Sequence, residues 1–124
     1  MPGISKQSAQ HDDYGPVESW HEEVAGQAIE FVLFKEDIDS APLLRGLPGD
    51  QCTCPHWGYV LSGRVTFTID GEDETYQTGD AFYVPPGHLQ RADGGTEYLQ
   101  FSPAAEIAVV EAQIMKNMQL LSGA

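Results

Sequence analysis

The sequence predicts an all-β barrel or sandwich followed by one C-terminal α-helix. Short apolar runs alternate with turn-forming residues along most of the chain, which is typical of antiparallel β proteins. The last segment instead repeats its apolar residues at helical spacing. The 124 residues, of which 41% are hydrophobic, are enough for one domain with a single core.

Three segments have clear strand patterns. Ala28–Lys35 is rich in β-branched and aromatic side chains, and Glu97–Phe101 is the last predicted strand. Apolar and polar residues alternate over Arg64–Ile69, which predicts a strand with one buried face. Asp70-Gly71 follows it and predicts a tight hairpin, because both residues tolerate positive φ.

The two ends of the chain differ from this strand-rich middle. Residues 1–15 are polar and interrupted by glycine and proline, which predicts a flexible N-terminal arm before a barrel at residues 16–102. Ser102-Pro103 is typical of a helix start, and we expect a helix over residues 103–122 with Gly123 at its end. We expect this helix to pack on the outside of the barrel or in a dimer contact. Its apolar stripe comprises Ile107, Val110, Ile114, Met118 and Leu121.

The charge of the chain argues against two classes of partner. The formal net charge is -13, with 19 acidic and 6 basic residues, and such a surface repels nucleic acid phosphates and anionic lipids. No apolar run approaches the ~20 residues of a membrane span. The N-terminus has no signal-peptide pattern, so we expect a cytoplasmic protein with reduced cysteines. A disulfide between Cys52 and Cys54 would be strained, and free thiols or metal ligands are better interpretations.

Two motifs stand out in the middle of the chain. Residues 52–64 read Cys-Thr-Cys-Pro-His-Trp-Gly-Tyr-Val-Leu-Ser-Gly-Arg, and residues 79–88 read Gly-Asp-Ala-Phe-Tyr-Val-Pro-Pro-Gly-His. The pair resembles the signature motifs of the cupin superfamily. It is most similar to small cupins with the pattern Cys-x-x-Pro-His-x-Gly-Tyr-Val-Leu-Ser-Gly. The resemblance covers about residues 45–101 and implies a cupin-type jelly-roll β-barrel with one pocket.

Cupin motifs typically supply three histidines and one carboxylate to a divalent metal, and here those positions are altered. With Gly63 setting the register, His56 falls at the glutamate position and Cys52 at a histidine position. Gln90 takes the place of the last histidine, and His88 lies two residues earlier, on the same strand face. The resemblance therefore implies a site for Zn, Fe, Ni or Cu formed by Cys52, His56 and His88.

The candidate site residues also have structural interpretations. His56 is our first candidate for a catalytic residue, as a ligand or as a general acid or base, but it can also be a hydrogen-bonded histidine at the barrel mouth. Cys52 can be a small hydrophobic residue, and His88 can pack at the corner after the Pro-Pro-Gly turn.

The remaining pocket residues are predicted to bind an organic ligand. Gln90 is a poor metal ligand and more plausibly orients a substrate through hydrogen bonds. Among the aromatic residues near the motifs, most of which are expected in the core, we assign Tyr59 and Phe101 to the lining of the pocket.

Two classes of function follow, and the sequence leaves open whether the protein is an enzyme. The first is a small metal-dependent enzyme of the dioxygenase, isomerase or cyclase type, acting on an organic molecule in the barrel. The alternative is a non-catalytic small-molecule binding or sensing module without metal, which the missing glutamate and the displaced histidine favour. We also expect a homodimer, since resembling cupins often pair through edge strands.

Overall fold

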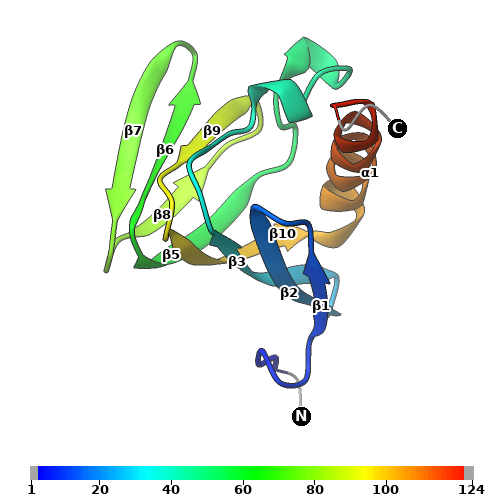
Figure 1. The fold of residues 1–124 in the computed structure, drawn as a ribbon, viewed down its shortest axis with the longest axis vertical. Coiled ribbons are helices and arrows are strands. Elements are labelled where there is room, and N and C mark those ends of the chain that lie inside the picture. Colours follow the sequence, from blue (N-terminus) through cyan, green and yellow to red (C-terminus); the bar gives the residue numbers. More distant parts are fainter. Residues whose placement is uncertain (1–2, 122–124) are drawn as a thin grey trace.

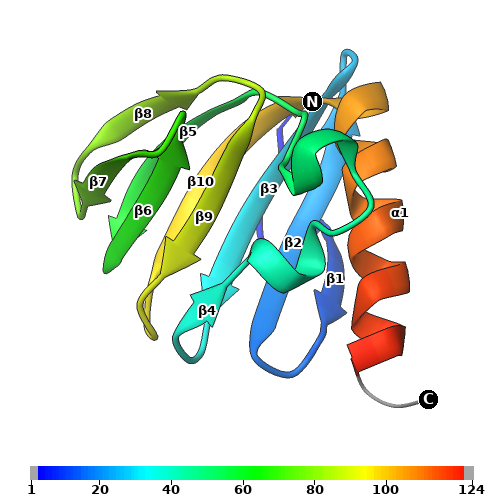
Figure 2. The ribbon, with the colours of Figure 1, turned by 90° about the horizontal axis from the view of Figure 1, so that it is seen from above.

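The computed structural model describes residues 3–121, which form two antiparallel sheets facing each other with one long helix beside them (Figures 1 and 2). This confirms the predicted all-β fold, a jelly-roll barrel with a C-terminal helix. Within the described residues, no helix is both long and apolar enough to cross a membrane.

The larger sheet has six strands in the order β1-β2-β3-β10-β5-β8. Its strands are β1 (Gln10–Asp13), β2 (Val17–Val24), β3 (Gln27–Phe34), β10 (Glu97–Pro103), β5 (His56–Ser62) and β8 (Ala81–Val84). Since β10 lies between β3 and β5, the end of the barrel sequence pairs with both its beginning and its middle.

The smaller sheet has four strands in the order β4-β9-β6-β7. They are β4 (Ile38–Asp39), β9 (His88–Ala92), β6 (Arg64–Ile69) and β7 (Glu72–Gln77). The predicted hairpin between β6 and β7 is confirmed: Asp70 and Gly71 have φ of 51° and 77°, and Ile69 pairs with Glu72.

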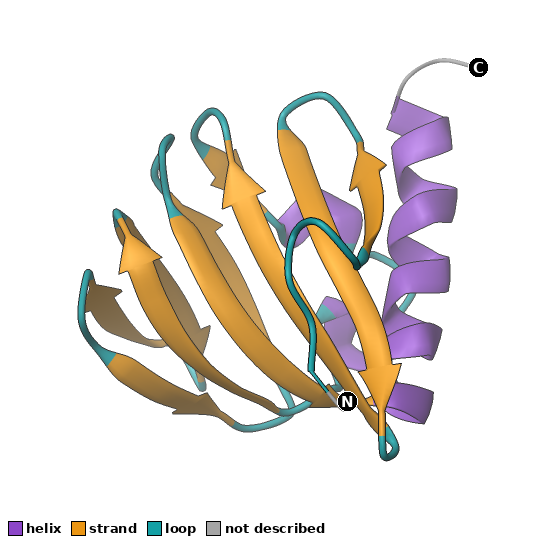
Figure 3. Ribbon diagram, turned by 90° about the horizontal axis from the view of Figure 1, so that it is seen from below, coloured by secondary structure: helices purple, strands orange, loops and turns teal. Residues whose placement is uncertain are grey.

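The two sheets face each other (Figure 3), and the core lies between them. Side chains alternate in direction along each strand, so every second residue points into this space. Phe67 and Val65 on β6 are fully buried against Val60 on β5 and Tyr98 on β10. On the smaller sheet, the side chains that point away from the core are polar, as is usual for an antiparallel sheet with one face exposed to solvent.

Helix α1 (Ala104–Leu121) packs beside the larger sheet and forms a second apolar cluster. Its Ile107 and Val110 pack with residues of the segment that carries the short 3₁₀ turns η1 (Ala41–Leu43) and η2 (Pro48–Asp50). Asn117 links the helix to the same segment, since its Nδ2 donates to the carbonyl oxygens of Leu43 and Arg45 at 2.7 and 2.8 Å. The helix is therefore anchored to the barrel at both ends of its buried face.

The predicted elements match closely, with differences at their ends. Arg64–Ile69 is β6 as predicted, whereas the strand expected at Ala28–Lys35 runs one residue earlier. The segment expected to be a flexible arm contains β1, which pairs with β2 in register, with Gln10 opposite His21. The predicted helix end at residues 122 and 123 lies outside the described residues.

Candidate functional site

The two sequence motifs meet through backbone pairing. Cys52 forms an isolated antiparallel bridge with His88: the Cys52 N–H donates to the His88 carbonyl at 2.9 Å, and the Gly87 N–H donates to the Cys52 carbonyl at 2.8 Å. Gly87 has φ of 91°, a conformation that glycine adopts without steric cost, and it turns the chain into β9. The bridge brings the side chains of Cys52 and His88 together.

His56 reaches the same place from the first residue of β5. Its side chain points inward and is buried, as is that of Ser102 on the neighbouring strand β10. His56 Nδ1 lies 2.7 Å from Ser102 Oγ, and Nε2 lies 3.5 Å from Cys52 Sγ. The hydrogen bond to the hydroxyl thus holds the ring with Nε2 toward the thiol.

The three predicted metal ligands form a compact cluster. One donor atom from each of Cys52, His56 and His88 lies within 4.8 Å of the others. The imidazoles of His56 and His88 meet edge to face, with ring centroids 5.0 Å apart. With metal–ligand bonds of 2.0 to 2.3 Å, two ligands of one tetrahedral ion are roughly 3.5 Å apart. The distance of 3.5 Å between Cys52 Sγ and His56 Nε2 therefore already fits two ligands of one ion.

The hydrogen bonds of His88 and His56 through Nδ1 allow Nε2 of each ring to bind a metal. His88 Nδ1 donates to the Pro85 carbonyl at 2.7 Å, and a carbonyl can only accept, so Nε2 of His88 carries the lone pair. When His56 Nδ1 donates to the Ser102 hydroxyl oxygen, Nε2 of His56 also carries a lone pair. A metal-binding histidine usually has this kind of second hydrogen bond.

Burial keeps all three groups uncharged. It lowers the pKa of His56 to about 3, with a further contribution from His88, and it lowers the pKa of His88. Burial also raises the pKa of the Cys52 thiol to about 11. Neutral imidazoles are ready to ligate, whereas the thiol loses its proton only when a cation is close.

The cluster lies in the wall of a cavity of about 540 Å³ between the two sheets and α1. Its polar wall residues include Ser40, Gln90 and Tyr98 near the cluster, and α1 contributes the apolar Ile114 and Met118. The helix was expected on the outside of the barrel or in a dimer contact; it lies beside the larger sheet and also forms part of the cavity wall.

Gln90, predicted to bind a ligand, lines this cavity. Its Nε2 donates to the Tyr98 hydroxyl oxygen at 2.9 Å, and its backbone N–H donates to Ser40. The Tyr98 O–H therefore has its proton available for another acceptor. Gln90 and His88 face the same side of β9, as the two-residue spacing predicts.

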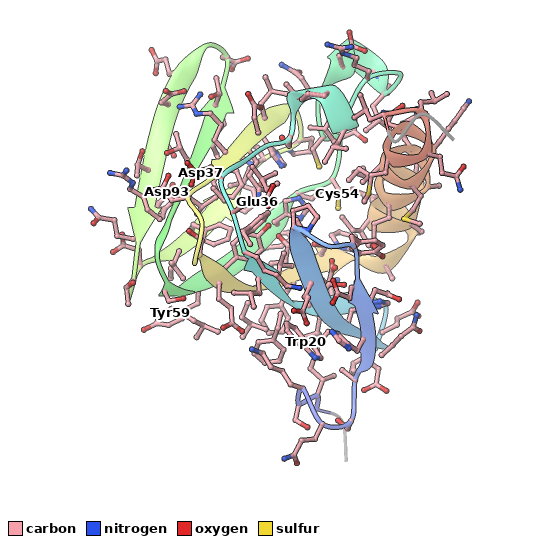
Figure 4. The ribbon with its side chains drawn as sticks, viewed as in Figure 1. Trp20, Glu36, Asp37, Cys54, Tyr59 and Asp93 are labelled. Atoms are coloured by element: carbon pink, nitrogen blue, oxygen red, sulfur yellow. The ribbon has the colours of Figure 1, made fainter. Side chains whose placement is uncertain are left out.

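Tyr59 and Phe101 are not part of the cavity. They are 44% and 39% exposed and lie on the outer face of the larger sheet, and Figure 4 shows Tyr59 at the edge of the molecule, far from α1. The reason is strand alternation: His56 points inward on β5, so Tyr59, an odd number of residues away, points outward. The outward direction of Tyr59 could have been predicted from the sequence by alternating inward and outward positions along the strand from His56.

Cys54, the second thiol, does not join the cluster. It is fully buried in the second apolar cluster, and its Sγ donates to the Pro55 carbonyl at 3.3 Å. Sequence reasoning also missed Ser102, which supports His56 from a strand 46 residues away. No local pattern marks this serine, because β10 joins β5 only in the folded sheet.

The fold and site together define a class, a small jelly-roll protein with a candidate ligand cluster inside its barrel. A family model described as a cupin domain matches residues 53–93, which span the first motif, the hairpin and the second motif. This segment of the chain is therefore similar to a cupin domain, and the whole described chain has a cupin-type jelly-roll fold. No curated protein matches the sequence.

Solved structures show the same fold at low sequence identity. An RmlC-like cupin from Shewanella frigidimarina is 18% identical with a TM-score of 0.59, covering 84% of this chain and 92% of that chain. The polyketide cyclase RemF from Streptomyces resistomycificus is 12% identical with a TM-score of 0.58, covering 84% and 80%. A PAC13 protein from Streptomyces, with uridine, is 14% identical with a TM-score of 0.55, covering 83% and 82%.

Proposed function

We propose that the protein binds a small organic molecule in the barrel cavity and holds a divalent metal ion with Cys52, His56 and His88. The observation that supports this proposal is convergence: donor atoms from these three residues lie within 4.8 Å of one another in the cavity wall. Two imidazoles and a thiol suit Zn²⁺, Fe²⁺, Ni²⁺ or Cu²⁺ better than Mg²⁺ or Ca²⁺.

The residues around the cluster fit such an ion. Both imidazoles are held by a hydrogen bond through Nδ1, and both are neutral. When bound, the ion would act as a Lewis acid toward the organic molecule or as an oxygen-activating centre. Tyr98, with Gln90 fixing its oxygen, can donate a hydrogen bond to the bound molecule.

Within the enzyme interpretation, a dioxygenase, isomerase or cyclase type of reaction remains our expectation. The similar structures include a polyketide cyclase and a protein with uridine, which supports an organic molecule as the occupant of this fold. His56 is better suited to be a ligand than a general base, because a pKa of about 3 makes its ring a weak proton acceptor.

A non-catalytic binding module without metal is the second candidate. It is favoured by the contacts that the cluster makes without an ion. Cys52 Sγ lies 3.7 Å from the Cys54 carbonyl oxygen and 3.5 Å from His56 Nε2, so its proton has two acceptors. The raised pKa of Cys52 keeps that proton in place near neutral pH.

Metal stoichiometry separates the two candidates. The protein would be purified without a histidine tag or chelator, reconstituted with each of the four ions, desalted and measured by elemental analysis. We expect about one metal ion per chain in the wild type and far less in His56→Ala and Cys52→Ala. The matched controls are His11→Ala, an exposed histidine, and Cys54→Ala, a buried thiol outside the cluster.

Either of two results would reject the metal. A wild type with well under one ion per chain after reconstitution leaves the metal-free binding module as the better function. Full stoichiometry in His56→Ala would place the ion elsewhere in the chain.

We also propose that the partner of this chain is a second copy, docked through the outer face of the larger sheet rather than through edge strands. Such a face is usually polar, but here it carries large apolar side chains, of which Trp57 and Tyr83 pack at 5.1 Å between ring centroids. The most exposed of these residues are Trp57, Tyr59, Leu61, Tyr83 and Phe101, each 39–48% exposed.

The area of this aromatic face fits a dimer. Together with the half-buried residues beside it, such as Leu99 and Phe31, the face offers roughly 600 Å² per chain. Two copies would bury roughly 1,200 Å², the lower end of the range for stable interfaces. A twofold contact needs only one self-complementary surface, which a flat apolar sheet face provides.

A further inference from the structure

The cavity has a second polar end, formed by side chains that the proposed metal does not use. Three side chains with acceptor oxygens lie there: Glu30 on β3, Gln100 on β10 and Glu111 on α1, all in the cavity wall. The helix α1 that carries Glu111 runs beside the strands β1 to β3 (Figure 2).

Glu30 and Gln100 are directly opposite each other in the antiparallel ladder between β3 and β10. Each is only 6% exposed. Gln100 Nε2 lies 3.4 Å from a Glu30 carboxylate oxygen, a weak hydrogen bond, and Gln100 Oε1 is buried without a partner in the protein. A buried acceptor without a donor is costly, and here it lies beside a buried carboxyl group.

The electrostatics of this end disfavour negative charge on the protein. Burial raises the pKa of Glu30 to about 7, and the nearby Glu111 adds to the effect. The pKa of Glu111 is raised as well, mainly by burial. His21 on β2 opposes both shifts but lies outside the cavity wall. The pair therefore lacks a counter-charge inside the cavity.

No cationic side chain supplies that charge. Among residues 3–121, the cavity wall contains Glu30, Asp39 and Glu111 but neither lysine nor arginine. The wall also contains Tyr14 and Ser19, which carry hydroxyl groups, and the apolar Val32, Phe34 and residues of α1. A ligand with a carboxylate or phosphate at this end would meet two carboxyl groups and no lysine or arginine.

We propose that this end of the cavity recognises the protonated amine of a ligand whose remaining body is hydrocarbon. The inference rests on the proposed function, in that it assumes that the cavity binds a small organic molecule. An ammonium group has three N–H donors and one positive charge, which match the two carboxyl groups and the unpartnered Gln100 oxygen. The apolar wall accommodates the body of the ligand.

Three probes of one shape test the charge preference: 4-phenylbutylamine, 4-phenylbutanol and 4-phenylbutyrate. Their binding to the metal-free protein at pH 7.5 would be measured by isothermal titration calorimetry, with the zinc-loaded protein in parallel. We expect the amine to bind at least tenfold more tightly than the alcohol, because charge-assisted hydrogen bonds are the stronger ones. The carboxylate is expected to bind most weakly to the metal-free protein.

Glu30→Gln tests the assignment of the site. It keeps the shape of the side chain but removes the charge, and we expect the preference for the amine over the alcohol to fall to within about threefold. Glu22→Gln is the matched control, since Glu22 is exposed on the other face of the same sheet and should leave the preference unchanged. If Glu30→Gln does not fold, Glu111→Gln from α1 serves as the second variant and should reduce the preference severalfold.

The outcomes distinguish this inference from the proposed function. If the alcohol or the carboxylate binds to the metal-free wild type as tightly as the amine, small-molecule binding stands and amine recognition is rejected. An amine preference that survives in both Glu30→Gln and Glu111→Gln also rejects it. If none of the probes binds with or without zinc, both the inference and the small-molecule function are overturned.

Discussion

The imidazole of His56 and the hydroxyl of Ser102 are joined by a 2.7 Å hydrogen bond between the neighbouring strands β5 and β10. Both side chains are buried, so this contact is shielded from water and has one geometry. It turns His56 Nε2 toward Cys52 Sγ. The orientation of the candidate metal ligand thus depends on a residue far away in the sequence.

Removal of this hydroxyl should weaken metal binding. In Ser102→Ala the His56 ring loses the hydrogen bond that orients it, and we expect the metal affinity to fall about 10- to 100-fold. Competition with a chromophoric chelator would measure the affinity. Ser62→Ala is the control, because the Ser62 hydroxyl donates to Gly95 at the other end of β5. Equal affinities in the two variants would show that Ser102 does not position His56.

A methyl group at Gly58 should destabilise the barrel. A Cβ there would overlap the ring of Phe82 and approach the Leu99 carbonyl oxygen to 2.8 Å, a distance that real Cβ atoms avoid. We expect Gly58→Ala to lower the free energy of unfolding by about 1 to 3 kcal/mol in urea denaturation. Adding Phe82→Leu should recover part of the loss. If Gly58→Ala is as stable as the wild type, the close packing of β5 against β8 is not as described.

The buried carboxyl group of Glu30 should make stability depend on pH. Its pKa is raised from an ordinary value of 4.5 to about 7, mainly by burial, so the folded protein holds this proton more tightly than the unfolded chain. The resulting stabilisation is complete below about pH 4.5 and is lost as pH rises through about 7.

Glu30→Gln should remove this dependence. We expect the variant to be more stable than the wild type at pH 8, by about 2 kcal/mol in urea denaturation, and the difference to shrink toward pH 5. The exposed Glu22→Gln should show no such trend. A Glu30→Gln variant that is less stable than the wild type at pH 8 would contradict a raised pKa.

The aromatic outer face should control the oligomeric state. Placing a carboxylate at its centre with Tyr59→Glu should convert a dimer to a monomer in sedimentation equilibrium, because the charge would be desolvated in the interface. Gln77→Glu, an exposed position on β7 in the other sheet, is the control and should remain dimeric. A wild type that is monomeric at 100 μM protein would reject the proposed interface.

Much of the fold could be predicted from local sequence. The alternation over Arg64–Ile69 and the turn at Asp70-Gly71 gave the hairpin correctly, because strand direction and turn conformation depend on neighbouring residues. The helical stripe predicted α1, which begins at Ala104. The strand β1 was not predicted, since Gln10–Asp13 is polar and becomes a strand only by pairing with β2.

The candidate metal site could be predicted only in part. Cys52, His56 and His88 come from two motifs, and the structure places their donor atoms within 4.8 Å of one another. Tyr59 and Phe101 were assigned to the cavity, although strand alternation places them outside. Glu30 was not proposed at all, since it lies in an ordinary strand pattern and becomes a cavity residue only beside Gln100.

The sequence by itself determined the elements of this protein: the hairpin, the final helix and the two motifs that carry the candidate ligands. Such features depend on residues near one another in the chain. Only the tertiary structure decided which side chains share the cavity. Ser102 reaches His56 and Gln100 reaches Glu30 because β10 lies between β5 and β3, and no local pattern encodes which strands become neighbours.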